Sequence, residues 1–222
     1  MTNPQRGKRL AKYVPDYVVF DLETTGINTA SDDIIEISAI KVKGGKPIDT
    51  FSTLVNPGRP IPYYATQVNG ITDEMVEDAP DIGAALADFL EFAGDAVLVG
   101  HNIHSFDLPF VYNAAERALG RSVGNDYIDT LFMARSCLPG LRHHKLVDIA
   151  GHFHIATKGA HRALKDCQMN QQCYEKMGKM QQGMELATCP RCGGELIKRN
   201  GRFGEFWGCG NYPECRYTKN IG

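Results

Sequence analysis

The sequence lacks the features that would assign it to several common classes of protein. No run approaches the roughly 20 consecutive apolar residues that a membrane helix requires, and no apolar segment typical of a secretory signal follows the basic N-terminus. The net charge is only −2 at pH 7, so overall charge does not indicate a nucleic-acid partner. We therefore expect a soluble cytoplasmic protein that has no membrane partner.

The chain also lacks the regular cysteine pattern of a secreted, disulfide-rich domain. Seven cysteines are present. Three of them are scattered, at Cys137, Cys167 and Cys173, and in a reducing cytosol we expect these to be free and partly buried thiols. The other four cluster near the C-terminus with the spacing of metal ligands.

Charge is distributed unevenly along the chain. Residues 1–187 carry 18 Lys and Arg against 23 Asp and Glu, whereas residues 188–222 carry 6 against 3. Four more basic residues are close together near the N-terminus, at Arg6, Lys8, Arg9 and Lys12. An acidic body with basic ends suits a metal-dependent protein that holds a polyanion at its margins. Ordinary solvated surface charge explains the same distribution equally well.

The length of 222 residues permits one domain of ordinary size and a small appendage. Apolar patterns predict strands at 17–22, 34–42, 47–57 and 96–100, and a strand leading into a helix within 127–138. They predict helices at 63–69, 81–93, 105–119, 144–153 and 162–180. This order predicts an α/β fold with a mixed sheet flanked by helices. We divide the chain into a loose basic tail (1–14), an α/β domain (15–182) and a small separate module (188–222).

Two acids interrupt the first predicted strand. Asp21 and Glu23 lie two residues apart in YVVFDLETTG, so both side chains face the same side of the strand. Buried carboxylates without a partner are costly, and we expect a cation to meet them. Solvated acids at an exposed strand end are the alternative. Thr24 and Thr25 follow in a turn, where their hydroxyl and backbone N–H groups can contact a phosphate or a terminal sugar hydroxyl.

Two later segments carry related chemistry. Asp107 follows a short predicted strand and lies near the N-terminus of a helix, where simple capping of the helix dipole is the alternative. Asn102 and Phe106, beside it, can contact a sugar and stack on a base. His161 precedes the last long helix and Asp166 lies about one turn inside it. An imidazole with its ordinary pKa near 6.5 suits a general base, although an isolated histidine is more often a surface residue.

These acids gain meaning if they converge. Four neighbouring carboxylates repel one another unless cations lie between them. Hard carboxylate ligands with open positions suit Mg²⁺ or Mn²⁺. Two such ions about 4 Å apart are a common device for hydrolysing a phosphodiester with an activated water.

The three segments, in this order and at these separations, resemble the DEDDh family of 3′→5′ exonucleases, which includes proofreading subunits of bacterial replicative polymerases. The matching motifs are DLETTG, GHNIHSFD and HRALKD. The resemblance covers about residues 15–180 and implies an RNase H-like fold with two Mg²⁺ or Mn²⁺ ions. It also implies a general base, His161, and four metal ligands, Asp21, Glu23, Asp107 and Asp166.

Two further segments extend this resemblance. VNGITDEMVEDAPDI (68–82) is similar to the family's segment around an HGIT motif, and HKLVDIAGHFHI (144–155) is similar to the stretch before the last motif. Asn69 stands where the family commonly has histidine, so we assign Asn69 no catalytic role.

The C-terminal cysteines predict one Zn²⁺ site. Cys189, Cys192, Cys209 and Cys215 form C-x2-C and C-x5-C pairs. The second spacing is longer than usual, but the set fits a Cys₄ zinc ribbon. Two disulfides are the alternative.

The whole module resembles the zinc ribbons of type IA topoisomerases, which bind single-stranded DNA. The resemblance implies strand contacts for which Arg202, Phe206 and Trp207 are candidates. Some aromatic side chains can instead fill the small core, and a zinc-mediated protein contact is a further alternative.

Together these features predict a 3′→5′ exonuclease that converts the 3′ end of single-stranded DNA to nucleoside 5′-monophosphates, while the ribbon retains the strand. A DNA polymerase is the protein partner that the resemblance suggests. An exoribonuclease is one alternative, because related DEDDh enzymes degrade RNA. A non-catalytic nucleic-acid-binding or polymerase-docking module is another, although the intact set of acids argues against it.

Overall fold

The computed structural model describes residues 6–157, 162–184, 186–202, 204–213 and 215–221. The strands are β1 (Tyr17–Thr24), β2 (Ile34–Lys43), β3 (Lys46–Leu54), β4 (Val97–Gly100), β5 (Tyr127–Asp129), β6 (Leu196–Gly201), β7 (Gly204–Cys209) and β8 (Thr218–Asn220). The helices are α1 (Tyr63–Asn69), α2 (Asp73–Val76), α3 (Ile82–Ala93), α4 (Asp107–Ala114), the π-helix η1 (Ala115–Leu119), α5 (Thr130–Cys137), α6 (Leu146–His152) and α7 (Ala163–Gln181).

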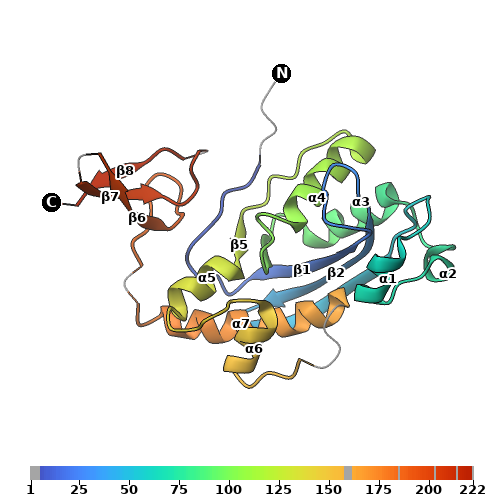
Figure 1. The fold of residues 1–222 in the computed structure, drawn as a ribbon, viewed down its shortest axis with the longest axis horizontal. Coiled ribbons are helices and arrows are strands. Elements are labelled where there is room, and N and C mark those ends of the chain that lie inside the picture. The colour runs from blue at the N-terminus through green and yellow to red at the C-terminus, as the bar shows by residue number, and fades with distance from the viewer. Residues whose placement is uncertain (1–5, 158–161, 185, 203, 214, 222) are drawn as a thin grey trace.

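The first five strands form one mixed sheet in the order β3-β2-β1-β4-β5. β1, β2 and β3 are antiparallel neighbours, and β4 and β5 continue the sheet parallel to β1. Helices α3 and α4 lie on one face and α5, α6 and α7 on the other (Figure 1). The predicted α/β fold with a mixed sheet flanked by helices is therefore confirmed.

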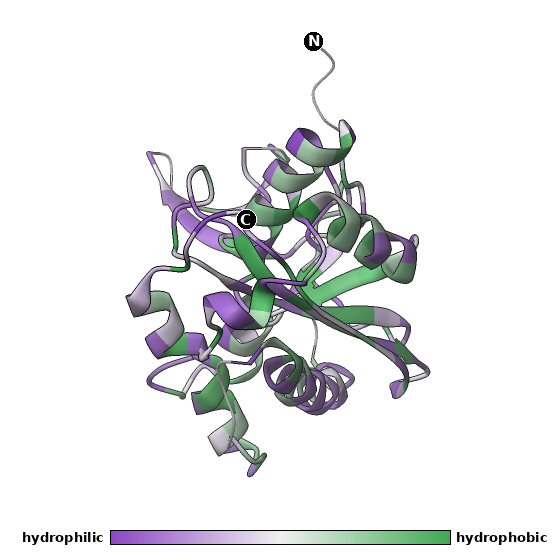
Figure 2. Ribbon diagram, turned by 90° about the vertical axis from the view of Figure 1, so that its right-hand side faces the viewer, coloured by the Kyte–Doolittle hydropathy of each residue, from purple (hydrophilic) through white to green (hydrophobic). Residues whose placement is uncertain are grey.

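Alternation along β1 produces two cores, one on each face of the sheet. Val18, Phe20 and Leu22 pack with residues of α3 and α4, whereas Tyr17 and Val19 pack with residues of α5, α6 and α7. The central strands are accordingly hydrophobic, and polar residues are frequent on the surrounding helices (Figure 2). Because side chains two residues apart share a face, Asp21 and Glu23 lie on the α7 side.

Local signals determine several helix ends. The Asp81 side chain accepts the Ala84 N–H at 2.9 Å and caps α3. Gly70 follows α1 with φ of 73°, a left-handed conformation that glycine adopts without strain. The helix predicted from residue 105 begins at Asp107 instead, and its second half is the π-helix η1. No helix among the described residues is long and apolar enough to cross a membrane.

The described part of the N-terminal segment packs against the domain. The Leu10 N–H donates to the Tyr127 carbonyl at 2.7 Å, and the Tyr127 N–H donates to the Lys8 carbonyl at 2.9 Å. Composition alone predicts a loose tail. The difference arises because the outer edge of β5 offers unpaired backbone groups, which this segment satisfies.

Strands β6, β7 and β8 form a second, three-stranded antiparallel sheet. This small unit contacts the domain directly, where the Ser136 hydroxyl donates to the Glu195 carboxylate at 2.7 Å, and also through Arg9, which is only 5% exposed. The Arg9 guanidinium lies 3.9 Å from the centre of the Phe132 ring and donates to the Gly210 carbonyl at 2.7 Å. The Asn211 side chain donates to the Arg9 carbonyl at 2.9 Å. The N-terminal segment thus joins the two units.

Candidate active site and zinc centre

Three of the predicted acids meet at one end of the sheet. Carboxylate oxygens of Asp21, Glu23 and Asp166 lie within 4.8 Å of one another. Asp21 and Glu23 reach this point from β1, and Asp166 from the first turn of α7. Residues about 145 positions apart in the sequence are therefore brought into a group that can hold a metal ion.

Asp107 approaches the same acids from the opposite layer. It is the first residue of α4 and is only 3% exposed. The backbone N–H of Leu22, which lies between the two β1 acids, acts to lower the pKa of Asp107 against the larger effect of burial. The charge of Asp107 raises the pKa of Asp21 and of Glu23. The connection from β4 to α4 thus brings a fourth carboxylate close enough to interact electrostatically with the other acids.

Burial and mutual repulsion make this a site that favours cations. Burial, followed by the charges of neighbouring acids, raises the pKa of Asp21 well above its usual range and that of Glu23 to about 8. Burial also raises the pKa of Asp107 to about 7. Without a cation, these acids retain protons near neutral pH. Clustered carboxylates that repel one another in this way fit Mg²⁺ or Mn²⁺.

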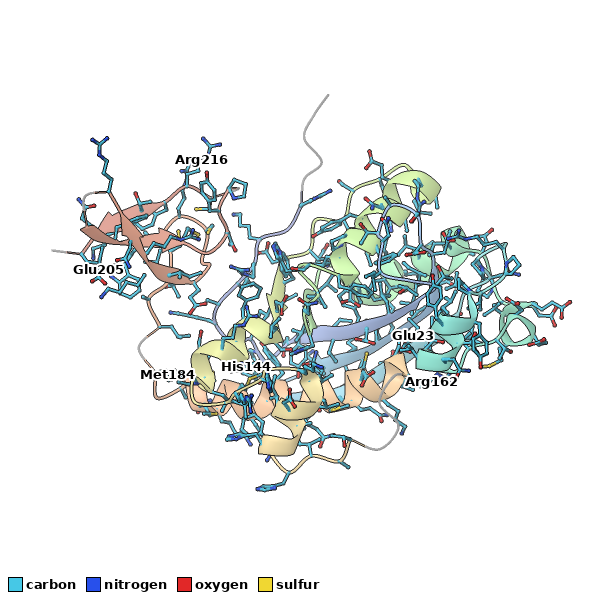
Figure 3. The ribbon with its side chains drawn as sticks, in the orientation of Figure 1. Glu23, His144, Arg162, Met184, Glu205 and Arg216 are labelled. Atoms are coloured by element: carbon cyan, nitrogen blue, oxygen red, sulfur yellow. The ribbon has the colours of Figure 1, made fainter. Side chains whose placement is uncertain are left out.

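The predicted general base, His161, lies outside the described residues. Its neighbour in sequence, Arg162, is described. Arg162 precedes α7 and its charge lowers the pKa of Glu23, partly offsetting the effect of the acids. Figure 3 shows Glu23 and Arg162 at the same end of the sheet. The assignment of His161 as base remains a prediction.

Two buried acids at this end of the sheet escape prediction from the sequence. Glu36 on β2 is 3% exposed and lies directly opposite Glu23. Asp129 at the end of β5 is 1% exposed and accepts the backbone N–H groups of Asn102, His104 and Leu131. The available signal was a charged residue inside each apolar strand, IIEISAI and YID.

The loop after β1 uses its hydroxyl groups internally. Thr24 donates to the Gly26 carbonyl at 2.6 Å. Thr25 is fully buried, and its hydroxyl accepts the Asp33 N–H at 2.9 Å. The hydroxyl of Thr25 therefore closes the loop, whereas the sequence predicts contact with substrate. Asn69, to which no catalytic role is assigned, is buried and its amide donates to the Thr24 carbonyl at 3.5 Å.

The loop between β4 and α4 holds the other two predicted substrate contacts. Asn102 adopts φ of 63°, a conformation that asparagine tolerates better than most residues. Its backbone N–H is held by Asp129 at 3.0 Å. Phe106 is partly buried, and its ring packs 5.2 Å from that of Phe110. Asp129 therefore orders the loop that leads into Asp107.

The four C-terminal cysteines converge as a metal site. Their Sγ atoms lie within 4.8 Å of one another, and no disulfide joins the described cysteines. The Cys189–Cys215 and Cys192–Cys209 Sγ pairs are 3.7 and 3.4 Å apart. Tetrahedral zinc with Zn–S bonds of about 2.3 Å requires sulfur atoms about 3.8 Å apart, so the cluster fits Zn²⁺. N–H groups of Asn211 donate to Cys209 and Cys192 at 3.4 and 3.5 Å.

The ribbon's predicted DNA-contacting side chains divide between its two faces. Phe206 lines an open cavity of about 250 Å³ together with Arg199, Tyr212, Arg216 and Tyr217. Trp207 is half-buried against the cysteine cluster. Arg202 is exposed near the turn between β6 and β7. Adjacent residues of a strand point to opposite faces, which explains why Phe206 faces the cavity and Trp207 supports the core.

The fold and the acid cluster together define a metal-dependent nuclease site on an RNase H-like sheet. The profile of the family described as "Exonuclease" matches residues 18–174, so the chain belongs to the exonuclease family. The profile described as "Topoisomerase DNA binding C4 zinc finger" matches residues 187–222. The expectation of a DEDDh-type exonuclease domain with a topoisomerase-type zinc ribbon is confirmed.

Relatives in sequence include bacterial DNA polymerase III proteins. The chain is 38% identical to the DNA polymerase III subunit epsilon of Aquifex aeolicus, over 72% of this chain and 79% of that protein. It is 42% identical to the PolC-type DNA polymerase III of Bacillus subtilis over 73% of this chain. That match spans only 11% of the PolC-type protein.

Similar solved structures are also exonucleases. E. coli exonuclease I in complex with a dT13 oligonucleotide has a TM-score of 0.68 at 18% identity, over 76% of this chain and 42% of that chain. Exonuclease X in complex with 5′-overhanging duplex DNA has a TM-score of 0.56 at 27% identity, over 75% and 91% of the two chains. The first likeness concerns the fold alone.

The raised pKa values predict that Mg²⁺ stabilises the protein more at pH 8 than at pH 6. Because the folded-state pKa values of Glu23 and Asp107 exceed those in the unfolded chain, the metal-free folded protein binds more protons than the unfolded chain between about pH 4 and pH 8. Its stability therefore falls as pH rises through this range. Binding of Mg²⁺ displaces the bound protons. For each displaced proton, the apparent affinity of the protein for Mg²⁺ therefore rises about tenfold per unit increase in pH.

Melting temperatures measured with EDTA and with Mg²⁺ at both pH values test this. We expect the melting temperature in EDTA to fall from pH 6 to pH 8, and Mg²⁺ to remove most of that fall. An Mg²⁺-induced increase that is equal at the two pH values, or larger at pH 6, contradicts displacement of protons from these acids.

Proposed function

We propose that this chain is a 3′→5′ exonuclease that removes nucleoside 5′-monophosphates from the 3′ end of single-stranded DNA, and that its zinc ribbon holds the strand. The single observation that carries this proposal is the convergence of the Asp21, Glu23 and Asp166 oxygens within 4.8 Å, with Asp107 buried beside them. The names of the relatives support a DNA substrate and a role beside a replicative polymerase.

The chain's own residues divide the work. Asp21, Glu23, Asp107 and Asp166 would hold two Mg²⁺ or Mn²⁺ ions. Such ions, when bound, lower the pKa of an attacking water and stabilise the leaving 3′-oxygen. His161 accepts the proton of that water, for which an imidazole is suited at neutral pH. Glu23 and Asp107 are buried, and charges that are shielded from water interact more strongly with a bound cation.

The ribbon supplies a second contact with the strand. Its cavity combines arginine and aromatic side chains, the combination that binds phosphates and stacks on bases without sequence preference. Glu205 and Arg216 of the ribbon lie at the other end of the molecule from Glu23 (Figure 3). A strand that reaches both sites has to pass along the domain, so the ribbon acts on long substrates.

End-labelled substrates test the direction and the chemistry. With Mn²⁺ or Mg²⁺, a 5′-labelled single strand should shorten one nucleotide at a time, whereas a 3′-labelled strand should release its label at once as a mononucleotide. EDTA should stop both reactions, because the acids then lack their cation. A duplex and an RNA strand of the same sequence show the substrate preference.

Each alternative has its own outcome. Binding of the single strand without metal-dependent release of mononucleotides would identify a non-catalytic binding module. Faster release from RNA than from DNA would identify an exoribonuclease. Release of a 5′ label as a mononucleotide before the strand has shortened would reverse the proposed direction.

A further inference from the structure

The buried carboxylate of Glu36, beside the acid cluster, accepts hydrogen bonds from the start of α7. Glu36 Oε1 accepts Arg162 Nη2 at 3.1 Å, and Glu36 Oε2 accepts Arg162 Nε at 3.3 Å. Glu36 Oε2 also accepts the backbone N–H of Ala163 at 3.3 Å. Both oxygens of this acid are thus engaged by the first residues of the helix. The planar two-point contact is the geometry in which arginine binds a carboxylate most specifically.

This contact fixes where α7 begins. Arg162 is the N-cap residue, with an extended backbone, and its own side chain does not cap the helix. The first N–H groups of a helix lack partners within the helix, and negative charge there is favourable. The Glu36 carboxylate takes the Ala163 N–H from the neighbouring strand β2. A side chain on the sheet therefore performs the capping that the helix sequence does not provide.

The anchored turn carries one of the proposed metal ligands, Asp166. The backbone N–H of Asp166 donates to the Arg162 carbonyl at 3.1 Å, so Asp166 lies one turn above the anchored residue. A shift of the helix start therefore moves Asp166, and a misplacement of about 1 Å can lower a rate by about 10²-fold.

We propose that Glu36 and Arg162 form a positioning pair, which holds the first turn of α7 so that Asp166 converges with Asp21 and Glu23, and that Glu36 is not itself a metal ligand. This inference rests on the proposed exonuclease activity. Its chemical basis is the fork of the guanidinium, which lysine cannot reproduce.

Four variants test the pair: Glu36→Gln, Arg162→Gln, the double substitution and Arg162→Lys. Lys179→Gln is the matched control, because it removes one positive charge from an exposed site at the far end of the same helix. Two measurements are made on each protein. The first is kcat and KM on a 3′-labelled single strand with Mn²⁺. The second is the number of Mn²⁺ ions bound, measured by calorimetry, which does not depend on turnover.

We expect each single Gln substitution to lower kcat about 10- to 100-fold, as loss of a partner behind a metal ligand does, with KM close to the wild-type value. The double variant should be no slower than either single variant, because the two side chains act as one unit. Arg162→Lys should lie between wild type and Arg162→Gln. Every variant should bind the wild-type number of Mn²⁺ ions, and Lys179→Gln should behave as wild type.

Three results overturn the proposal. Loss of one Mn²⁺ ion in Glu36→Gln but not in Arg162→Gln would make Glu36 a ligand. Wild-type kcat in both single variants would contradict the positioning role. A double variant whose kcat falls by the product of the two single reductions would contradict it as well. Arg162 is half-exposed, so its variants remain informative if the buried Glu36→Gln substitution prevents folding. A wild-type protein without Mn²⁺-dependent cleavage is a different result, because it overturns the proposed function itself.

Discussion

Asp21→Asn should abolish metal-dependent hydrolysis of single-stranded DNA and at the same time raise the melting temperature of the metal-free protein. The two effects have one cause. The Asp21 carboxylate is surrounded by Glu23, Asp107 and Asp166, and burial followed by their charges raises its pKa well above its usual range. This negative charge lowers the stability of the metal-free folded protein. We propose that the same charge attracts the cation.

The loss of activity should be large. Under the proposed role of Asp21 as a metal ligand, its removal costs several kcal/mol of stabilisation of charge in the transition state, which corresponds to about 10³-fold or more in rate. The amide of asparagine has nearly the shape of the carboxylate and can donate to the neighbouring acids. The substitution therefore leaves no cavity, and the gain in stability comes from the removal of repulsion.

Single-turnover rates with Mn²⁺ and thermal melts in EDTA at pH 8 measure the two effects. Asp166→Asn should behave in the same way, because its oxygens belong to the same cluster. Asp78→Asn is the matched control, because Asp78 is exposed, and it should change neither quantity. Full activity in Asp21→Asn contradicts the role of this acid as a metal ligand. A lower melting temperature with lost activity would mean that the carboxylate stabilises the metal-free fold.

Cys192→Ser should unfold the zinc ribbon while leaving the exonuclease domain folded. Units of fewer than about 40 residues rarely bury enough apolar surface to fold alone. The ribbon core consists of the cysteine cluster with Leu196, Trp207 and Tyr217 packed around it. Structural zinc contributes about 10–16 kcal/mol to comparable units, so loss of one ligand removes most of the driving force for folding.

The functional consequence should depend on substrate length. Base stacking contributes about 1–3 kcal/mol per base, so losing the ribbon's cavity should weaken binding of a long single strand about 10²-fold or more. The rate on a short oligonucleotide, which occupies only the acid cluster, should stay near the wild-type value. Zinc content, the amide NMR signals of residues 188–222 and binding by fluorescence anisotropy measure these effects. Equal losses on short and long strands would place the ribbon in the reaction itself.

Phe206→Ala separates strand binding from folding of the ribbon. Phe206 lines the cavity, whereas its neighbour Trp207 packs against the cysteines. The variant should keep its zinc but bind long strands less tightly. Ile48→Ala, which removes an exposed apolar side chain from β3, is the control. If Phe206→Ala binds long single strands as tightly as the wild type, the cavity is not part of the binding surface.

Much of the candidate site follows from short motifs. The two acids of DLET lie two residues apart, and strand geometry alone places them on one face, as the structure shows. The C-x2-C and C-x5-C pairs likewise predict a cluster of four cysteines, which the structure brings together. Spacing is informative in these cases because the backbone geometry of a strand or a knuckle is the same in every protein.

Side-chain partners were harder to predict. Glu36 in IIEISAI is the one charged residue of a largely apolar stretch, yet it is buried opposite Glu23 and hydrogen-bonded to Arg162, which lies 126 positions later. Arg9, in a stretch that reads as a loose basic tail, is buried between the domain and the ribbon. Thr25 looks available to substrate, but it is fully buried and its hydroxyl accepts the backbone N–H of Asp33. Each outcome depends on a residue distant in sequence or on a turn that composition does not specify.

The sequence by itself determined the class of fold and the presence of a zinc ribbon, because periodicity and ligand spacing are local properties. The resemblance to the exonuclease family supplied the four acids that we propose as metal ligands. Only the tertiary structure decided which acids touch, which carboxylate is already paired with an arginine, and how the N-terminal segment joins the ribbon to the domain. Those outcomes depend on strand order, register and helix placement. The free energy that favours one arrangement is a sum over contacts between residues far apart in the chain. A local sequence pattern cannot predict such a sum.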